Sequence, residues 1–159
     1  MIFVALGTQK FQFNRLLKII DDLLEENVIR EEVFVQSGHS TYVLKNCKYK
    51  KFLNRDEYIE KLNKCDVVIT HGGVGTIITA LKSDKKVIAM ARRSEFAEHV
   101  DNHQIQILEA FKQSQLIVKI ETKMELKTTI ETLSNQQFNK YISNTKTIIN
   151  SIESFITNL

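Results

Sequence analysis

Residues 65–81 read CDVVITHGGVGTIITAL, and this stretch decides the fold. The mostly apolar run at 66–70 is typical of a strand buried on both faces. Glycines at 72, 73 and 75 then permit a sharp turn, and the apolar residues at 77–81 predict a helix. The stretch is therefore predicted to be a strand, a glycine turn and a helix.

The same alternation runs along most of the chain. Further strands are predicted at 2–6, 33–36, 49–53, 86–91 and 116–118, and further helices at 14–28 (with Asn14 as its cap), 56–64, 102–111 and 122–133. Alternating strands and helices are typical of a parallel sheet covered on both faces. Because such crossovers are almost always right-handed, we expect one α/β, Rossmann-like domain over residues 1–135.

Residues 136–159 have a different character. Apolar residues recur every three or four positions among polar neighbours, which predicts a long amphipathic helix with one apolar stripe. The stripe comprises Phe138, Tyr141, Ile142, Ile148, Ile149, Ile152, Phe155, Ile156 and Leu159. It can pack on the chain's own domain or on a partner, and the sequence leaves both possibilities open.

Composition is ordinary for a packed protein. The 159 residues are 43% hydrophobic and 26% charged, and the net charge of +3 offers no concentrated basic face for nucleic acid. One local excess of positive charge is formed by Lys45, Lys48, Lys50, Lys51 and Arg55. This run is either a solvated loop and strand edge or a contact for an anionic partner or lipid headgroup.

Targeting and metal-binding patterns are missing from the sequence. The amino terminus, MIFVALGTQ, lacks a basic leader and is read as a buried strand, and no apolar stretch approaches the ~20 residues that cross a bilayer. Cys47 and Cys65 lack the paired spacing of a zinc site. We therefore expect a cytoplasmic protein that binds no metal.

Three segments follow predicted strands and should meet at one edge of the sheet. They are Gly7-Thr8-Gln9, residues 71–76 and residues 91–104. In an open parallel sheet, ligands bind at the carboxyl ends of the strands. The sequence therefore predicts a ligand site at this edge.

The segment 71–76 carries the clearest chemistry. Glycines at 72, 73 and 75 let a ligand approach the backbone, and the following helix presents unpaired N–H groups and the positive end of its dipole. Thr76 can add a hydroxyl, while His71 can donate a ring N–H to a diphosphate oxygen as the nucleoside diphosphate leaves. A turn needed only for packing would use the same glycines. The segment matches neither the GxxxxGK[ST] nor the GxGxxG pattern.

The segment 92–104, RRSEFAEHVDNHQ, contains many charged and amide groups and follows a predicted buried strand in the sequence. Asp101 or Asn102 could simply cap the helix that begins there. His99 and His103 lack metal-ligand spacing with His71, so no zinc site is predicted.

Taken together and in order, FVALGTQ with FNRL, VQSGHS, CDVVITHGGVGTI and EHVDNHQ resemble the C-terminal domain of glycosyltransferase family 28 over roughly residues 1–120. The resemblance includes the peptidoglycan enzyme that forms lipid II and the soluble catalytic subunit of the two-chain UDP-N-acetylglucosamine transferase of the dolichol pathway. The chain looks most like small bacterial chains of capsule and exopolysaccharide clusters that pair with a membrane-associated partner.

The resemblance implies the donor half of a GT-B fold, with a UDP-sugar as substrate and no cofactor. It implies that the diphosphate is held by His71, Gly72, Gly73, Gly75 and Thr76, with Gly7 and Thr8 lining the phosphate side. It further implies that Asp101 and Gln104 contact the sugar, with Glu98 and His99 nearby, and that Arg92 passes the uracil. The family's ribose-binding glutamate is replaced here by Thr79, so a ribose contact must be weaker or come from elsewhere.

We therefore expect a catalytic subunit of an inverting, metal-independent transferase that moves a hexose to a lipid-linked saccharide. Because the sequence starts at the first strand of the donor domain, we expect the acceptor half, and the general base, on a membrane-associated second chain that recruits this one to the inner face of the membrane. The alternative is a non-catalytic accessory subunit that stabilises or activates a transferase, although a scaffold would not need the 71–76 loop. An epimerase of GT-B shape would need about twice this length.

Overall fold

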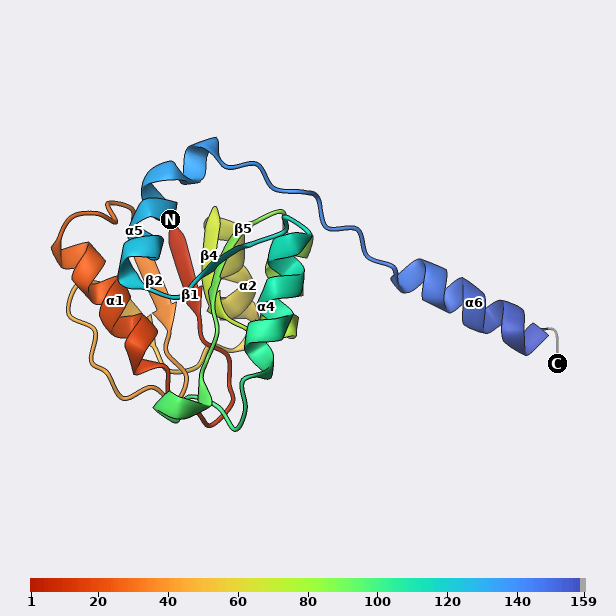
Figure 1. Cartoon of the computed structure of the whole chain (residues 1–159), viewed down its shortest axis with the longest axis horizontal. Helices are drawn as coiled ribbons and strands as arrows, with labels where there is room; N and C mark the ends of the chain where they lie inside the picture. Colours follow the sequence, from red (N-terminus) through yellow and green to blue (C-terminus); the bar gives the residue numbers. More distant parts are fainter. Residues whose placement is uncertain (158–159) are drawn as a thin grey trace.

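The computed structural model describes residues 1–157, which contain one sheet of six parallel strands (Figure 1). The strands are β1 (Ile2–Ala5), β2 (Val33–Gln36), β3 (Lys48–Lys50), β4 (Val67–His71), β5 (Lys86–Met90) and β6 (Val118–Ile120). Their order across the sheet is β3-β2-β1-β4-β5-β6. This arrangement confirms the predicted Rossmann-like fold.

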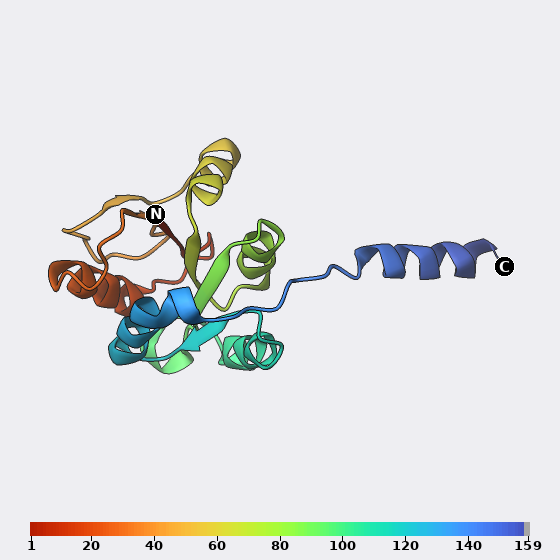
Figure 2. The same cartoon turned by 90° about the horizontal axis from the view of Figure 1, so that it is seen from above.

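Helices cover both faces of the sheet. They are α1 (Asn14–Glu25), α2 (Arg55–Lys64), α3 (Val74–Lys82), α4 (His103–Gln113), α5 (Lys123–Thr132) and α6 (Thr145–Thr157), with short 3₁₀ turns η1 (Ser94–Phe96) and η2 (Leu133–Asn135). Helices α1 and α5 pack on one face, and α2, α3 and α4 on the other (Figure 2). The sheet therefore separates two hydrophobic cores.

Strands β1 and β4 lie side by side at the centre of the sheet, with Ala5 opposite Thr70. The chain leaving β1 enters α1 on one face, whereas the chain leaving β4 enters α3 on the other. Connections that diverge in this way open a crevice at the carboxyl ends of the two strands, which is where open α/β sheets bind ligands.

The start of α1 differs from the prediction. Asn14 was expected to cap this helix, but the cap position is Phe13 and carries no side-chain cap bond. The side-chain oxygen of Asn14 instead accepts hydrogen bonds from the backbone N–H groups of Thr41 and Tyr42, each at 2.9 Å. The prediction of a cap was wrong because the loop after β2 uses the same acceptor.

The tail is helical over a shorter range than predicted. Residues 136–144 are not helical, and α6 begins at Thr145. Phe138 packs against the core on the α1 side of the sheet, whereas Tyr141 packs against the core on the α3 side. In a helix these two residues would share one face, so a single helix could not reach both cores. The contacts of Phe138 and Tyr141 therefore require an open chain.

Helix α6 projects away from the domain (Figures 1 and 2). None of its described residues is buried. Its exposed apolar residues are Ile148, Ile149, Ile152, Phe155 and Ile156, while Leu159 of the predicted stripe lies outside the described residues. The part of the stripe on α6 does not lie on the chain's own domain in this structure, and its packing on a partner stays a prediction. Within residues 1–157, no helix has both the length and the apolar character that crossing a membrane requires.

Candidate functional site

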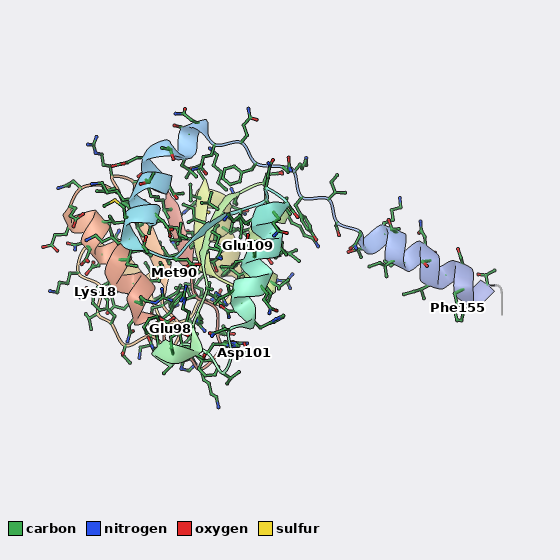
Figure 3. All side chains as sticks on the ribbon, viewed as in Figure 1. Lys18, Met90, Glu98, Asp101, Glu109 and Phe155 are labelled. Atoms are coloured by element: carbon green, nitrogen blue, oxygen red, sulfur yellow. The ribbon has the colours of Figure 1, made fainter. Side chains whose placement is uncertain are left out.

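The predicted site residues come together at the carboxyl edge of the sheet. Figure 3 labels Glu98 and Asp101 at this edge, beside η1 and far from Phe155 on α6. The edge carries the chain after β1, the glycine turn between β4 and α3, and the long loop between β5 and α4.

His71 ends β4 and is enclosed between two glycines. Only 5% of its surface is exposed. A Cβ atom added to Gly7 would lie 2.8 Å from Cε1 of the ring, and one added to Gly73 would lie 2.4 Å from Nε2. Gly7 also has a φ of +72°, a conformation that residues with a Cβ rarely adopt. These two glycines therefore make the space that the imidazole fills.

The environment of His71 keeps the ring neutral. Its Nδ1 lies 3.2 Å from the hydroxyl oxygen of Thr70. Burial, reinforced by the positive charge of Arg92, lowers the pKa of His71 to about 4. At neutral pH the imidazole is therefore uncharged when no ligand is bound.

The N-terminus of α3 lies open beside this ring. A Cβ atom added to Gly75 would meet nothing within 4 Å. Gly7, Thr8, Gly75 and Thr76 line a cavity of about 540 Å³. Backbone N–H groups of a first helical turn have no partner within the helix, so this cavity adjoins the most favourable position for an anion.

The opposite wall of the cavity was not anticipated from the sequence. It is formed by Gln36 and by residues at the start of α2, namely Leu53, Asn54, Arg55, Tyr58 and Ile59. One signal could have located it: Asn54 and Glu57 have the spacing of a capping box, and the structure contains that box at the start of α2. A helix that starts just after a parallel strand starts at the ligand edge.

Thr79, which stands in place of the family's glutamate, also lines the cavity. Its hydroxyl donates a hydrogen bond of 2.7 Å to the carbonyl oxygen of Gly75. The side chain is therefore engaged with its own helix, and Arg55 on the facing wall is the charged group available for a ligand.

Gln104 connects two of the three segments. Its side-chain oxygen accepts hydrogen bonds from the backbone N–H of Gly72, at 3.0 Å, and of Arg92, at 3.2 Å. Because this oxygen holds both loops, Gln104 fixes the glycine turn relative to the end of β5. The predicted contact with a sugar would therefore use the side-chain amide nitrogen of Gln104.

Arg92 is fully buried beneath the site rather than exposed at it. Its Nη2 donates a hydrogen bond of 2.8 Å to the carbonyl oxygen of Leu6, and its guanidinium lies 5.4 Å from the centre of the Phe13 ring. Burial lowers its pKa to about 10, while Glu98 acts in the opposite direction. Nε and Nη1 have no hydrogen-bond partner within the described chain. Arg92 therefore contributes a buried positive charge to the floor of the site.

Glu98 is also buried, and its carboxylate is held inside the protein. It accepts two hydrogen bonds from the guanidinium of Arg15 on α1, at 3.0 and 2.8 Å, and a third from the backbone N–H of Arg93 at 3.0 Å. Arg15 was missed by the sequence reasoning, although FNRL was noted as a motif. A charged residue beside the apolar face of a helix is a signal that it has a buried partner.

His99 and Asp101 lie closer to the surface. The ring of His99 packs 5.2 Å from that of Phe11, and its Nδ1 lies 3.1 Å from a carboxylate oxygen of Asp101. Asp101 is exposed and also accepts a hydrogen bond from the backbone N–H of His103, which lowers the pKa of its carboxyl. The side chain of Asn102 does not cap α4. Asp101 is therefore the one acidic site residue that faces outward.

The buried charges beneath the site favour an anion. Arg15 and Arg92 bring two positive charges, and Glu98 brings one negative charge between them. In residues 1–157, no three His, Cys, Asp or Glu side chains are grouped closely enough to hold a metal ion. An open helix N-terminus and a positive floor together suit a phosphate or diphosphate.

Comparison with known proteins places this chain in a family. The family description "Glycosyltransferase family 28 C-terminal domain" matches residues 1–159. Comparison with curated proteins found no match.

Three solved structures are similar in fold. The glycosyltransferase of kitacinnamycin has a TM-score of 0.60 and 16% identity, over 84% of this chain and 34% of that one. The glycosyltransferase SnogD from Streptomyces nogalater has a TM-score of 0.52 and 21% identity, over 76% of this chain and 31% of that one. The solution structure of ALG13 has a TM-score of 0.59 and 18% identity, over 95% of this chain and 93% of that one.

The structural similarities show a shared fold, and this chain spans about a third of the length of the first two glycosyltransferases. A family description that matches the whole chain goes further, and on that ground this protein belongs to the glycosyltransferase family 28 C-terminal domain.

Proposed function

We propose that this protein binds a UDP-sugar at the crevice between β1 and β4 and is the catalytic donor-binding subunit of a hexosyltransferase. One observation carries the proposal: His71 stands beside the open N-terminus of α3, and the same crevice continues into a cavity of about 540 Å³. The helix terminus suits the diphosphate, and the cavity has the volume of a small-molecule site. Family membership supports the glycosyltransferase role.

In this proposal the reaction is an inverting displacement without a metal. The acceptor hydroxyl attacks the anomeric carbon, the bond from that carbon to the diphosphate oxygen breaks, and a base takes the hydroxyl proton. His71, the α3 N-terminus and the buried charge of Arg92 stabilise the negative charge that develops on the leaving UDP. In the same proposal Asp101, whose side chain is exposed, binds sugar hydroxyls.

The base is assigned to a second chain. His39, the remaining histidine near the edge, packs against the ring of Phe52 at 5.0 Å and is exposed at the end of β2. We propose a membrane-associated partner that presents a lipid-linked saccharide in capsule or exopolysaccharide synthesis. The exposed stripe of α6 supports such a partner because an isolated helix of thirteen residues is marginally stable in water.

The donor assignment is tested by calorimetric titration with UDP, GDP and ADP. We expect selective binding of UDP, and a loss of at least about tenfold in affinity for His71→Ala, because a charge-assisted hydrogen bond contributes about 1.5 kcal/mol or more. His103→Ala is the matched control, since His103 lies at the same edge but is exposed and faces Gln106. Preference for GDP or ADP, or binding of none of the three, would contradict the assignment.

The catalytic role is separated from an accessory role by transfer assays on the reconstituted pair. If this chain catalyses, transfer should collapse for His71→Ala. Survival of transfer in that variant would favour the accessory role.

The role of α6 is tested by cell fractionation. We expect the wild-type chain to sediment with membranes that contain the partner, and Ile152→Glu to remain in the supernatant because it places a charge in the apolar stripe. Asn150→Glu, on the opposite face of α6, should behave as the wild type. Equal sedimentation of the two variants would argue against the stripe as the contact.

A further inference from the structure

Thr70 and His71 form a hydrogen-bonded chain that begins at the backbone of β1. The hydroxyl of Thr70 is fully buried and donates a hydrogen bond of 2.6 Å to the carbonyl oxygen of Ala5. A hydroxyl has a single hydrogen. The oxygen of Thr70 can therefore only accept at its contact with Nδ1 of His71, which lies 3.2 Å away.

This assignment decides where the imidazole carries its hydrogen. The alternative, in which Thr70 donates to Nδ1, would leave two oxygens 2.6 Å apart with no hydrogen between them. Nδ1 must therefore be the protonated nitrogen of the neutral ring, and Nε2 carries only a lone pair. Nε2 is also the ring nitrogen nearest to Gly73, the N-cap residue of α3.

A lone pair at that position conflicts with a phosphate oxygen, which is itself an acceptor. The ring can donate from Nε2 only as an imidazolium. We propose that Thr70 is a positioning residue that holds the hydrogen of His71 on Nδ1, so that the ring binds a diphosphate oxygen only after taking up a proton at Nε2. The proton comes from solvent and stays on Nε2 until the diphosphate leaves.

The surroundings of His71 are consistent with uptake driven by the ligand. Burial disfavours a charged ring most strongly; Arg92, just after β5, and His99, in the loop before α4, act in the same direction, while the backbone carbonyl of Ala5 acts in the opposite one. The glycines that enclose the ring carry no titratable group, and the carboxylate of Glu98 is engaged by Arg15. Within the described chain no acidic side chain is hydrogen-bonded to the ring, so the arriving anion supplies the missing negative charge.

The consequence is a defined dependence of ligand affinity on pH. Without ligand His71 has a pKa of about 4, and in the complex the adjacent diphosphate raises it. Between these two values the complex binds more protons than the free protein, so affinity rises as the pH falls, by up to about tenfold per pH unit. Above the pKa of the complex the affinity no longer depends on His71.

The inference rests on the proposed function only for the identity of the ligand, UDP. It is tested by titrating the protein with UDP from pH 6 to pH 8 in buffers of different ionisation enthalpy, which gives the number of protons taken up. His71→Gln is titrated in parallel to subtract protons that belong to UDP itself. We expect the wild type and Thr70→Ser to take up more protons than His71→Gln, approaching one extra proton at the acid end.

Thr70→Val removes the acceptor while keeping the shape of the side chain. Nε2 can then carry the hydrogen of the neutral ring, so we expect the extra proton uptake to disappear and the pH dependence of the affinity to match that of His71→Gln. A purely structural role for Thr70 would lower the affinity and leave the uptake unchanged, and that result would overturn the proposal.

A second measurement needs neither a variant nor a ligand. Nitrogen chemical shifts of the His71 ring at pH 7 report its tautomer directly, and we expect hydrogen on Nδ1. Hydrogen on Nε2 would overturn the inference without touching the proposed function. Conversely, failure to bind UDP would remove the proposed function and leave this measurement valid.

Discussion

The two loops at the ligand edge use their polar groups in opposite ways. The short turn from His71 to Thr76 has few polar side chains, yet its helix N-terminus opens onto a cavity. The long loop of residues 92–104 is rich in charge, yet Arg92, Glu98 and Gln104 are buried and hydrogen-bonded to other parts of the protein. Density of polar residues therefore does not indicate which loop meets a ligand. The open backbone groups at the start of α3 do.

The largest effect is expected where the long loop is anchored. Glu98→Ala leaves the guanidinium of Arg15 without its carboxylate, and removing one member of a buried ion pair costs about 3 kcal/mol or more. We expect that decrease in the free energy of unfolding, measured with urea. In the double variant Glu98→Leu with Arg15→Met, much of the loss should be recovered. A loss below about 1 kcal/mol in the single variant would show that the pair does not anchor the loop.

A matched pair of glycine variants sharpens the comparison within the short turn. Gly73→Ala places a methyl group 2.4 Å from the His71 ring, whereas Gly75→Ala meets nothing within 4 Å. Overpacking of a buried site costs about 1–3 kcal/mol, so we expect Gly73→Ala to lower both stability and UDP affinity. Gly75→Ala should leave stability unchanged or raise it slightly, because alanine favours a helix more than glycine does. It should lower the affinity for UDP, because its methyl group projects into the space of the ligand.

Calorimetry and urea unfolding of both variants check this expectation. Unchanged UDP affinity in Gly75→Ala would mean that the ligand does not approach this part of the turn. Equal stability of the two variants would show that the His71 ring can move aside.

The smallest effect is expected at Asp101, which lies in the long loop but is exposed, unlike Arg92, Glu98 and Gln104. Asp101→Asn keeps an oxygen for the backbone N–H of His103, so stability should change by less than about 0.5 kcal/mol. Affinity for UDP should be unchanged. The additional affinity of a UDP-sugar over UDP should fall by up to about tenfold, because a carboxylate accepts sugar hydroxyls more strongly than an amide. UDP-galactose, UDP-N-acetylglucosamine and UDP-glucuronate are the donors to compare, and an unchanged ratio for all three would remove Asp101 from the sugar site.

The fold could be predicted from the sequence because its signals are local. The buried runs at Ile2–Ala5 and Val67–His71 lie close to their predicted bounds, and the glycine turn marks the crevice between them. The tail was predicted less well. Periodicity of apolar residues cannot distinguish a helix from an open chain whose apolar residues reach two different cores, as Phe138 and Tyr141 do.

The site could be predicted only in outline. Chain order brings the three segments to one edge, but pairing at long range decides which side chains remain open. The contacts between Arg15 and Glu98 and between Gln104 and Gly72 join residues 83 and 32 positions apart. The α2 wall of the cavity depends on the position of an edge strand, which the sequence around Lys48–Lys50 predicts weakly because all three residues are exposed.

The place where α6 leaves the domain constrains the geometry of any assembly. The tail crosses the domain near the beginning of β5, where the amino group of Lys86 lies 6.0 Å from the centre of the Phe138 ring, whereas the ligand edge lies at the end of the strands. The five residues of β5 correspond to ~17 Å of height at about 3.3 Å per residue. A partner that binds α6 in this position must therefore extend along one side of the sheet to reach the proposed sugar site. The attachment point of α6 and the ligand edge therefore lie at opposite ends of the strands, and the length of the strands sets the distance between them.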